Sequence, residues 1–299
     1  MIKPERIIPH LIVPSGDKIS LQKDFDPAWI PEGLGKREAR KGLQGDIQLL
    51  TRYQDMLYAQ NNYALLIIFQ AMDAAGKDST IKHVMSGLNP QGCQVHSFKA
   101  PSPEELDHDY LWRCSKALPE RGRIGIFNRS YYEEVLVVRV HPEILKRQQL
   151  PGGSADKGIW RRRFREINHF ERYLAANGIV ILKFFLHVSK DEQKKRFLER
   201  IDRPEKNWKF SAADARERSF WDDYMKAYED VLNNTSTRWA PWHVVPADHK
   251  WVTHLAVGAV ICHAMSRLKP AYPRVSEAHL QQLRKARQML ESEAVITGG

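Results

Sequence analysis

Apolar and polar residues follow two different patterns along the chain. Short, nearly continuous apolar runs occur at five places, residues 64–69, 95–98, 124–127, 179–186 and 242–245. Such runs are typical of strands that are buried on both faces of a parallel sheet. Because segments of helical pattern separate them, the sequence predicts one α/β domain with a mainly parallel five-stranded sheet flanked by helices.

The intervening segments place apolar residues at every third or fourth position, which is the spacing of an amphipathic helix. Two helix starts are clear, because Ser102 is followed by proline and Glu105 in a capping-box order, and Ser189 is followed by Glu192. The first predicted helix is interpreted as a packing helix or a dimer surface. Helices are expected at 43–61, 102–118, from 189 onward, 221–232 and 252–265.

The two ends of the chain differ from the middle. Residues 1–40 are punctuated by proline and glycine and are expected to form an irregular extension that wraps the body. Residues 41–270 hold all the predicted strands and form the main domain. Residues 271–299 are expected to form a helical tail.

Charge narrows the choice of partner. The chain has 299 residues and a formal net charge of +10, which favours nucleic acid, a phosphorylated ligand or an anionic surface. No apolar run approaches the roughly 20 residues that span a bilayer, so no membrane association is expected. Three widely spaced cysteines and a polar start predict a reducing, cytoplasmic location.

A loop rich in small residues joins the first apolar run to a helix expected near Ser79. In such a loop the backbone N–H groups converge on phosphate oxygens and a lysine bridges the terminal phosphates. The usual Walker pattern fails twice here, because Ala71 replaces the first glycine and Asp78 precedes the serine. The strand–loop–helix order still predicts a phosphate-binding loop with Lys77 in the bridging role. The candidate phosphate-binding residues are Ala74, Ala75, Gly76, Asp78 and Ser79.

The third apolar run ends in polar residues, as a Walker-B strand does. An Asp is expected there to hold Mg²⁺, and this chain has Asn128, which brings an oxygen but no charge. Nearby carboxylates could compensate, namely Asp73 and either Glu133 or Glu134. Arg129 is placed to clamp a transferring phosphoryl group, and the alternative is an ion pair between Arg129 and Glu133.

A third segment, residues 200–214, is dense in cations and contains Trp208. It is either a solvated loop or a segment that closes over an anionic ligand.

Four segments together resemble polyphosphate kinase family 2, namely residues 70–78, 127–136, 206–210 and 240–248. The resemblance spans about residues 40–268. It implies a thymidylate-kinase-like P-loop fold of three layers, with a helical lid at about residues 200–222. It also implies Mg²⁺-dependent, reversible phosphoryl transfer between inorganic polyphosphate and nucleotides, with Mn²⁺ as an alternative ion.

The resemblance assigns roles to single residues. Asp73 and Lys77 match the catalytic pair of the family's phosphate loop, and Arg129 matches the arginine after the strand. Lys206 and Lys209 fall in the lid motif and are expected to bind phosphate or nucleotide.

The expected metal ligands are Asp73 and Asn128, and Glu133 completes the catalytic set. With Asn128, residues 127–130 read Phe-Asn-Arg-Ser, and this segment resembles the subgroup of the family that phosphorylates AMP as well as ADP. Adenine nucleotides are therefore the expected partners, with guanine nucleotides as an alternative. A general base is not needed, because the attacking phosphate oxygen is already anionic.

A densely charged polyphosphate chain needs a basic channel beside the loop. Lys82, Arg113 and Arg139 are the candidate channel residues, and each could equally be a surface cation.

Two other functions stay open at this stage. One is an ATP-dependent nucleotide kinase of the same fold, and the other is a nucleic-acid-binding protein attracted by charge. No helix-turn-helix, RRM-like or zinc motif supports the second, so no nucleic-acid partner is expected. A homodimer or homotetramer is expected, with the helix at residues 43–57 as its candidate surface.

Overall fold

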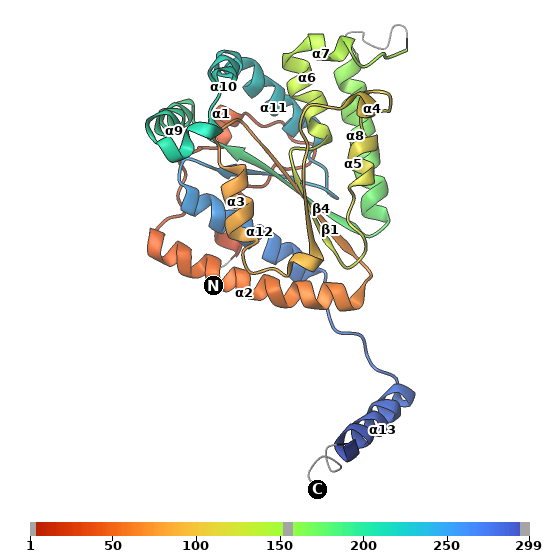
Figure 1. Ribbon diagram of the computed structural model, residues 1–299. Coiled ribbons are helices and arrows are strands. Elements are labelled where there is room, and N and C mark those ends of the chain that lie inside the picture. Colours follow the sequence, from red (N-terminus) through yellow and green to blue (C-terminus); the bar gives the residue numbers. More distant parts are fainter. Residues whose placement is uncertain (1–3, 152–157, 294–299) are drawn as a thin grey trace.

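Helices cover both faces of a central sheet in this computed structural model (Figure 1). The structure describes residues 4–151 and 158–293. The outermost residues of the expected extension and tail, 1–3 and 294–299, lie outside the described residues.

All five predicted strands are confirmed, with ends within two residues of those expected. They form one parallel sheet in the order β2-β3-β1-β4-β5. The strands are β1 (Ala64–Ala71), β2 (Cys93–Ser97), β3 (Ile124–Asn128), β4 (Ile179–His187) and β5 (Trp242–Pro246).

The helices around the sheet vary from single turns to long rods. The α-helices are α1 (Leu21–Asp24), α2 (Lys36–Gln60), α3 (Lys77–Val84), α4 (Pro103–Leu106), α5 (Trp112–Lys116), α6 (Val137–Val140), α7 (Pro142–Lys146), α8 (Ile159–Ala176), α9 (Lys190–Asp202), α10 (Ala212–Glu217), α11 (Trp221–Thr235), α12 (Lys250–Arg267) and α13 (Glu277–Glu293). Short 3₁₀ helices are η1 (Pro4–Arg6), η2 (Ile8–His10), η3 (Pro90–Gly92), η4 (Tyr131–Val135), η5 (Pro204–Lys209) and η6 (Arg218–Phe220).

The strand order decides where a ligand can bind. Strand β1 lies between β3 and β4, so the chain leaves its carboxyl end and that of β3 toward the same edge of the sheet. In register, Phe69 of β1 is the partner of Asn128 at the end of β3. Ligands bind at such switch points in open α/β sheets. The predicted phosphate loop and the polar end of β3 are therefore neighbours.

Helix α2 begins at Lys36, seven residues earlier than expected, because its first two turns are largely polar and lack the apolar stripe. The stripe itself packs against α12, where Leu50 and Leu57 are fully buried and Gly258 approaches Leu43. The residues that suggested a dimer surface therefore pack within the protomer.

The single helix expected at 102–118 is wrong, because the structure has two short helices there, α4 and α5. The start is as predicted, since Ser102 and Glu105 form a capping box. The interruption comes at Asp109, whose side chain accepts a hydrogen bond from the backbone N–H of Leu111 at 2.9 Å. Such local bonds compete with a continuous helix.

The N-terminal extension covers the free edge of β5. The N–H of Val13 donates to the carbonyl of Trp242, and the N–H of Val244 donates to that of Leu11. Because Leu11 and Val13 are fully buried, the extension shields an edge strand that would otherwise be open to pairing.

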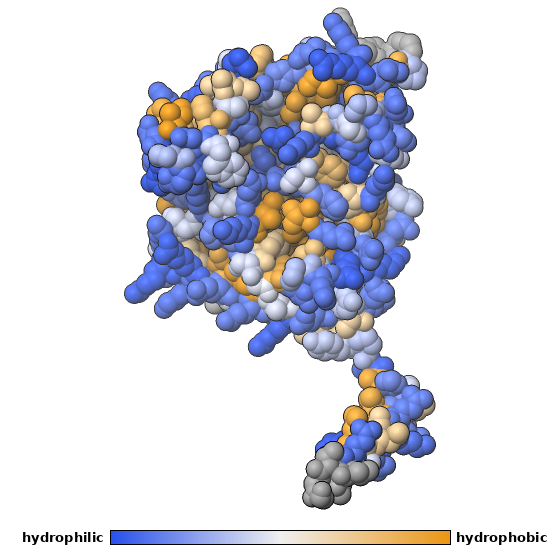
Figure 2. Space-filling model, viewed as in Figure 1, coloured by the Kyte–Doolittle hydropathy of each residue, from blue (hydrophilic) through white to orange (hydrophobic). Residues whose placement is uncertain are grey.

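Helix α13 stands away from the body at the end of an extended segment (Figure 1). Figure 2 shows apolar side chains along it, and Leu283, Met289 and Leu290 are exposed. Among the described residues, no helix is long and apolar enough to cross a membrane.

Candidate active site

The phosphate loop has the strand–loop–helix geometry that the sequence predicted, with α3 beginning at Lys77 rather than near Ser79. Ala74 and Gly76 have φ angles of 60° and 107°. The left-handed conformation explains why residue 76 is a glycine, because a φ near 107° strains any residue with a Cβ. This turn brings successive backbone N–H groups to the N-terminus of α3, which favours binding of an anion.

Lys77 lies folded over this loop, with its Nζ donating to the carbonyl of Ala71 at 3.0 Å. Burial lowers the pKa of Lys77, and Asp73 opposes that shift. The ammonium is therefore short of compensating negative charge, and a bound phosphate would supply it.

Two side chains of α9 hold the loop from behind. Arg196, only 5% exposed, donates to the carbonyls of Ala74 and Ala75 at 3.0 and 2.9 Å. Its Nη2 donates to the carbonyl of Ala247 after β5 at 2.6 Å. Gln193 donates to the carbonyl of Asp73 at 3.0 Å. Neither Arg196 nor Gln193 was among the site residues predicted from the sequence.

The turn after β3 lies beside the loop. Arg129 has a φ of 65°, and its guanidinium lies 3.6 Å from the carboxylate of Asp73. Burial alone would lower the pKa of Arg129, but Glu133 and Asp73 outweigh it and raise the pKa. Among the described ion pairs the partner of Arg129 is thus Asp73, not Glu133. Glu133 instead accepts a hydrogen bond from Gln70 at 2.8 Å.

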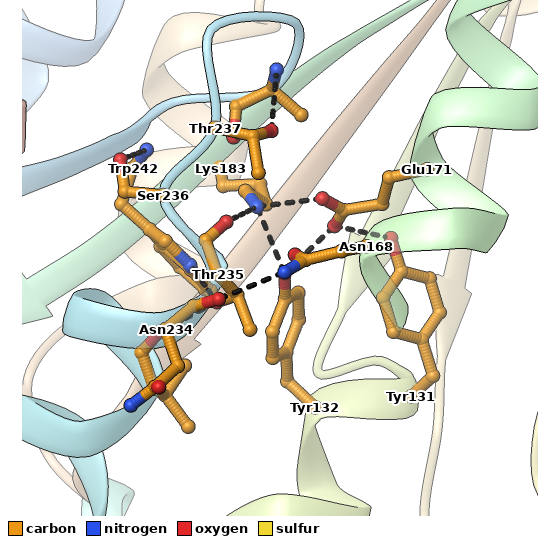
Figure 3. A network of polar contacts seen from close by, with 12 residues as sticks. Tyr131, Tyr132, Asn168, Glu171, Lys183, Asn234, Thr235, Ser236, Thr237 and Trp242 are labelled. Carbon is orange, nitrogen blue, oxygen red and sulfur yellow. Dashed lines mark hydrogen bonds and ion pairs between the residues drawn. The ribbon is translucent and has the colours of Figure 1, made fainter. Parts of the chain in front are cut away.

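A buried polar network anchors this turn (Figure 3). The hydroxyls of Tyr131 and Tyr132 donate to the same oxygen of Glu171 at 2.9 and 2.8 Å. Lys183 donates to the other oxygen of Glu171 at 2.7 Å and to the carbonyl of Thr235 at 2.7 Å. Because Tyr131 and Tyr132 belong to η4, the network fixes the turn that also carries Glu133.

A cavity of about 490 Å³ opens beside these residues, within the size range of nucleotide-sized ligands. Of the predicted site residues, Asp73, Arg113, Arg129 and Glu133 line it. Much of the remaining wall is apolar or aromatic, with Leu106, Val137, Val138, Ile144, Tyr224 and Tyr228.

A second cavity of about 390 Å³ adjoins the first. Arg113 and Glu134 line both, so the two cavities share a wall. Arg113 donates to the carbonyl of Lys99 at 2.8 Å, and Arg163 forms a buried ion pair with Glu134 at 3.1 Å. Two buried cations, Arg113 and Arg163, thus line the second cavity, and Arg113 lines the first as well.

The remaining predicted cations are not among the residues that line these cavities. Arg139 pairs with Asp230, and Lys82 is exposed on α3. In the expected lid, Lys206 pairs with Glu199 at 2.7 Å.

Lys209 lies over the ring of the exposed Trp208, again outside the cavity lining. Ser79 lies 3.4 Å from Nε2 of His254 on α12. The channel, lid and phosphate-binding roles of these residues stay predictions.

A family model described as Polyphosphate kinase 2 (PPK2) matches residues 33–273 of this sequence. The chain belongs to the polyphosphate kinase 2 family. The expected family and the expected P-loop fold are therefore confirmed.

Relatives in the polyphosphate kinase 2 family match nearly the whole chain. An ADP-polyphosphate phosphotransferase of Rhodopseudomonas palustris is 54% identical over 282 residues, which cover 93% of this chain and 96% of that protein. An AMP/ADP-polyphosphate phosphotransferase of Meiothermus ruber is 45% identical, covering 86% and 92%. The crystal structure of polyphosphate kinase 2 from Arthrobacter aurescens superposes with a TM-score of 0.83 at 41% identity, covering 92% and 95%.

Proposed function

We propose that this enzyme transfers phosphoryl groups between inorganic polyphosphate and nucleotides, converting AMP to ADP and ADP to ATP, reversibly. The observation that carries the proposal is that Asp73 of the phosphate loop, Arg129 and Glu133 line one nucleotide-sized cavity. The names of the relatives from Rhodopseudomonas palustris and Meiothermus ruber agree with both acceptors.

The chemistry is one of positioning and charge neutralisation, because phosphate attacks phosphate without a general base. Lys77 and the N–H groups of the loop hold the transferring phosphoryl group. Arg129 neutralises charge on the same group, and Asp73 orients its guanidinium across the 3.6 Å contact. Fixed donors of this kind need no reorganisation when the phosphoryl group moves.

The cavity wall suits a nucleoside. The ring and sugar would pack on the apolar side, beside Val138, Ile144 and Tyr228, and the phosphates would point toward Asp73 and Arg129.

Family membership implies a divalent metal ion, and the donor set fits Mg²⁺. Among the described residues no three His, Cys, Asp or Glu side chains form a ready-made metal site. Asp73 just after β1 and Asn128 at the end of β3 nevertheless lie at the carboxyl ends of neighbouring strands. The buried Oε1 of Gln70 has no partner among the described residues. Mg²⁺ prefers few protein oxygens completed by substrate phosphates and water. Asp73 and Asn128 would hold it, with Mn²⁺ as an alternative ion.

The bound ion would neutralise phosphate charge. We infer a role for Glu133 in the same catalytic set, since its hydrogen bond from Gln70 holds it at the cavity wall.

The test is to incubate the protein with polyphosphate, Mg²⁺ and either AMP or ADP, and to measure ADP and ATP by chromatography. We expect product with polyphosphate. Product formed only when ATP replaces polyphosphate would favour the nucleotide kinase, and no product with either acceptor would contradict the proposal. Arg129→Met should lose transfer, whereas Arg284→Met, an exposed arginine of α13, should not.

A further inference from the structure

The start of α3 and the end of β3 carry two side chains in exchanged positions. In a Walker-A loop the residue after the lysine is serine or threonine, whose hydroxyl contacts Mg²⁺, and the Walker-B strand supplies an aspartate. Here Asp78 follows Lys77, and β3 ends in Asn128. The neutral group and the carboxylate have changed places.

The exchanged side chains meet in the structure. Nδ2 of Asn128 donates a hydrogen bond to Oδ1 of Asp78 at 2.7 Å. This bond orients the amide, because its N–H₂ group is committed to the carboxylate. The pair therefore keeps the one negative charge of the usual arrangement, with the charge moved from the strand to the helix.

We propose that Asp78 supplies the carboxylate that the Walker-B position of this chain lacks, and that the hydrogen bond from the amide of Asn128 orients this carboxylate. This inference rests on the proposed function, because it concerns the metal-binding edge of that same site. The negative charge of the metal site would then come from two carboxylates, Asp73 and Asp78. Asn128 would contribute no charge.

A simpler role for Asp78 would be to stabilise α3, in whose first turn it lies. A carboxylate near a helix N-terminus is favourable whatever its neighbours. That role predicts a lower melting temperature for Asp78→Asn and no change in metal-dependent binding. In that role Asn128 takes no part. A second substitution at Asn128 could then not restore the stability that Asp78→Asn removes.

The experiment measures the affinity for ATP by calorimetry with and without Mg²⁺, in the absence of polyphosphate. The ratio of the two affinities reports the contribution of the ion without any turnover. We expect Asp78→Asn to reduce this ratio by roughly 10–100-fold. The double variant Asp78→Asn/Asn128→Asp, which returns the charge to the strand, should recover most of the loss.

Two further variants sharpen the comparison. Asp78→Ser/Asn128→Asp rebuilds the usual Walker pair and should also respond to Mg²⁺, even if Asp78→Asn alone does not fold. Asp191→Asn makes the same change in the first turn of α9, where the side chain is exposed, and should leave the ratio unchanged.

A wild-type ratio for Asp78→Asn would overturn the inference, and so would double variants that bind no better than the single one. A single variant that only melts at lower temperature would show that Asp78 serves the helix. If the wild-type affinity for ATP does not respond to Mg²⁺ at all, the proposed metal site itself is wrong and the inference falls with it. The wild-type measurement therefore distinguishes a failure of the proposed metal site from a failure of the role inferred for Asp78.

Discussion

Replacing Lys183 by methionine should destabilise the protein strongly. Its ammonium group is fully buried and makes three hydrogen bonds, to Glu171, to the hydroxyl of Tyr132 and to the carbonyl of Thr235 (Figure 3). Methionine fills a similar volume but leaves the carboxylate of Glu171 buried without a cation. Breaking one partner of a buried pair costs about 3–5 kcal/mol, a large part of the roughly 5–15 kcal/mol that holds a domain folded.

The double variant Lys183→Met/Glu171→Gln separates the cost of the unpaired charge from the cost of lost packing. Glutamine keeps an acceptor for the two tyrosine hydroxyls but carries no charge. We therefore expect the double variant to recover about 2 kcal/mol relative to the single one, because contacting residues do not contribute additively. Urea unfolding followed by tryptophan fluorescence measures both, and Trp242 beside the network is a local reporter.

A cost of less than about 1 kcal/mol for Lys183→Met, the size of an ordinary neutral hydrogen bond, would contradict a strongly stabilising charge pair. A double variant that is no more stable than the single one would contradict it as well. Either result would mean that water or rearrangement already compensates the carboxylate.

Four further predictions concern activity, binding and pH. Lys77→Met should lower the transfer rate roughly 100–1000-fold without loss of fold, as removal of a fixed donor does, whereas Lys226→Met, an exposed lysine on α11, should not. Lys206→Ala with Lys209→Ala should raise KM and lower kcat if the segment closes over substrate, and unchanged kinetics would make it a surface element. The affinity for polyphosphate should fall steeply with added salt, because charges are screened within about 10 Å at 0.1 M, and a salt-independent affinity would oppose the basic channel. Burial lowers the pKa of His243 from 6.5 to about 4, so the neutral ring is favoured in the fold and stability should be lost as pH falls through that window. Thermal melting at several pH values checks this, and His243→Phe should reduce the loss without removing it, because burial lowers the pKa of His187 and His254 to about 4 as well.

Local sequence signals predicted the elements that build the site. The apolar run of β1 and the small residues before Lys77 are contiguous, so the strand and the loop could be read without knowing any distant contact. The carboxyl end of β3 was predictable for the same reason, because its apolar run and the polar residues after it are contiguous. The sequence could not show that Arg196 grips the loop, because that contact spans 121 residues and the side chain is one of many cations on α9.

The buried network could be predicted from local sequence signals only in part. Lys183 lies inside the apolar run of β4, and a lysine in a strand buried on both faces needs a partner, so a buried charge pair could have been expected. No local sequence signal identifies Glu171 as that partner. Glu171 lies on α8 and contacts the lysine only after the helix has packed on the sheet. The same packing fixes η4, which begins two residues after Arg129, and the φ of 65° at Arg129 is a strained conformation. Strain of this kind persists only where the surroundings determine it. The position of the guanidinium beside Asp73 therefore depends on a polar contact made on the far side of the turn, which is why the motif alone identifies the residue but not its geometry.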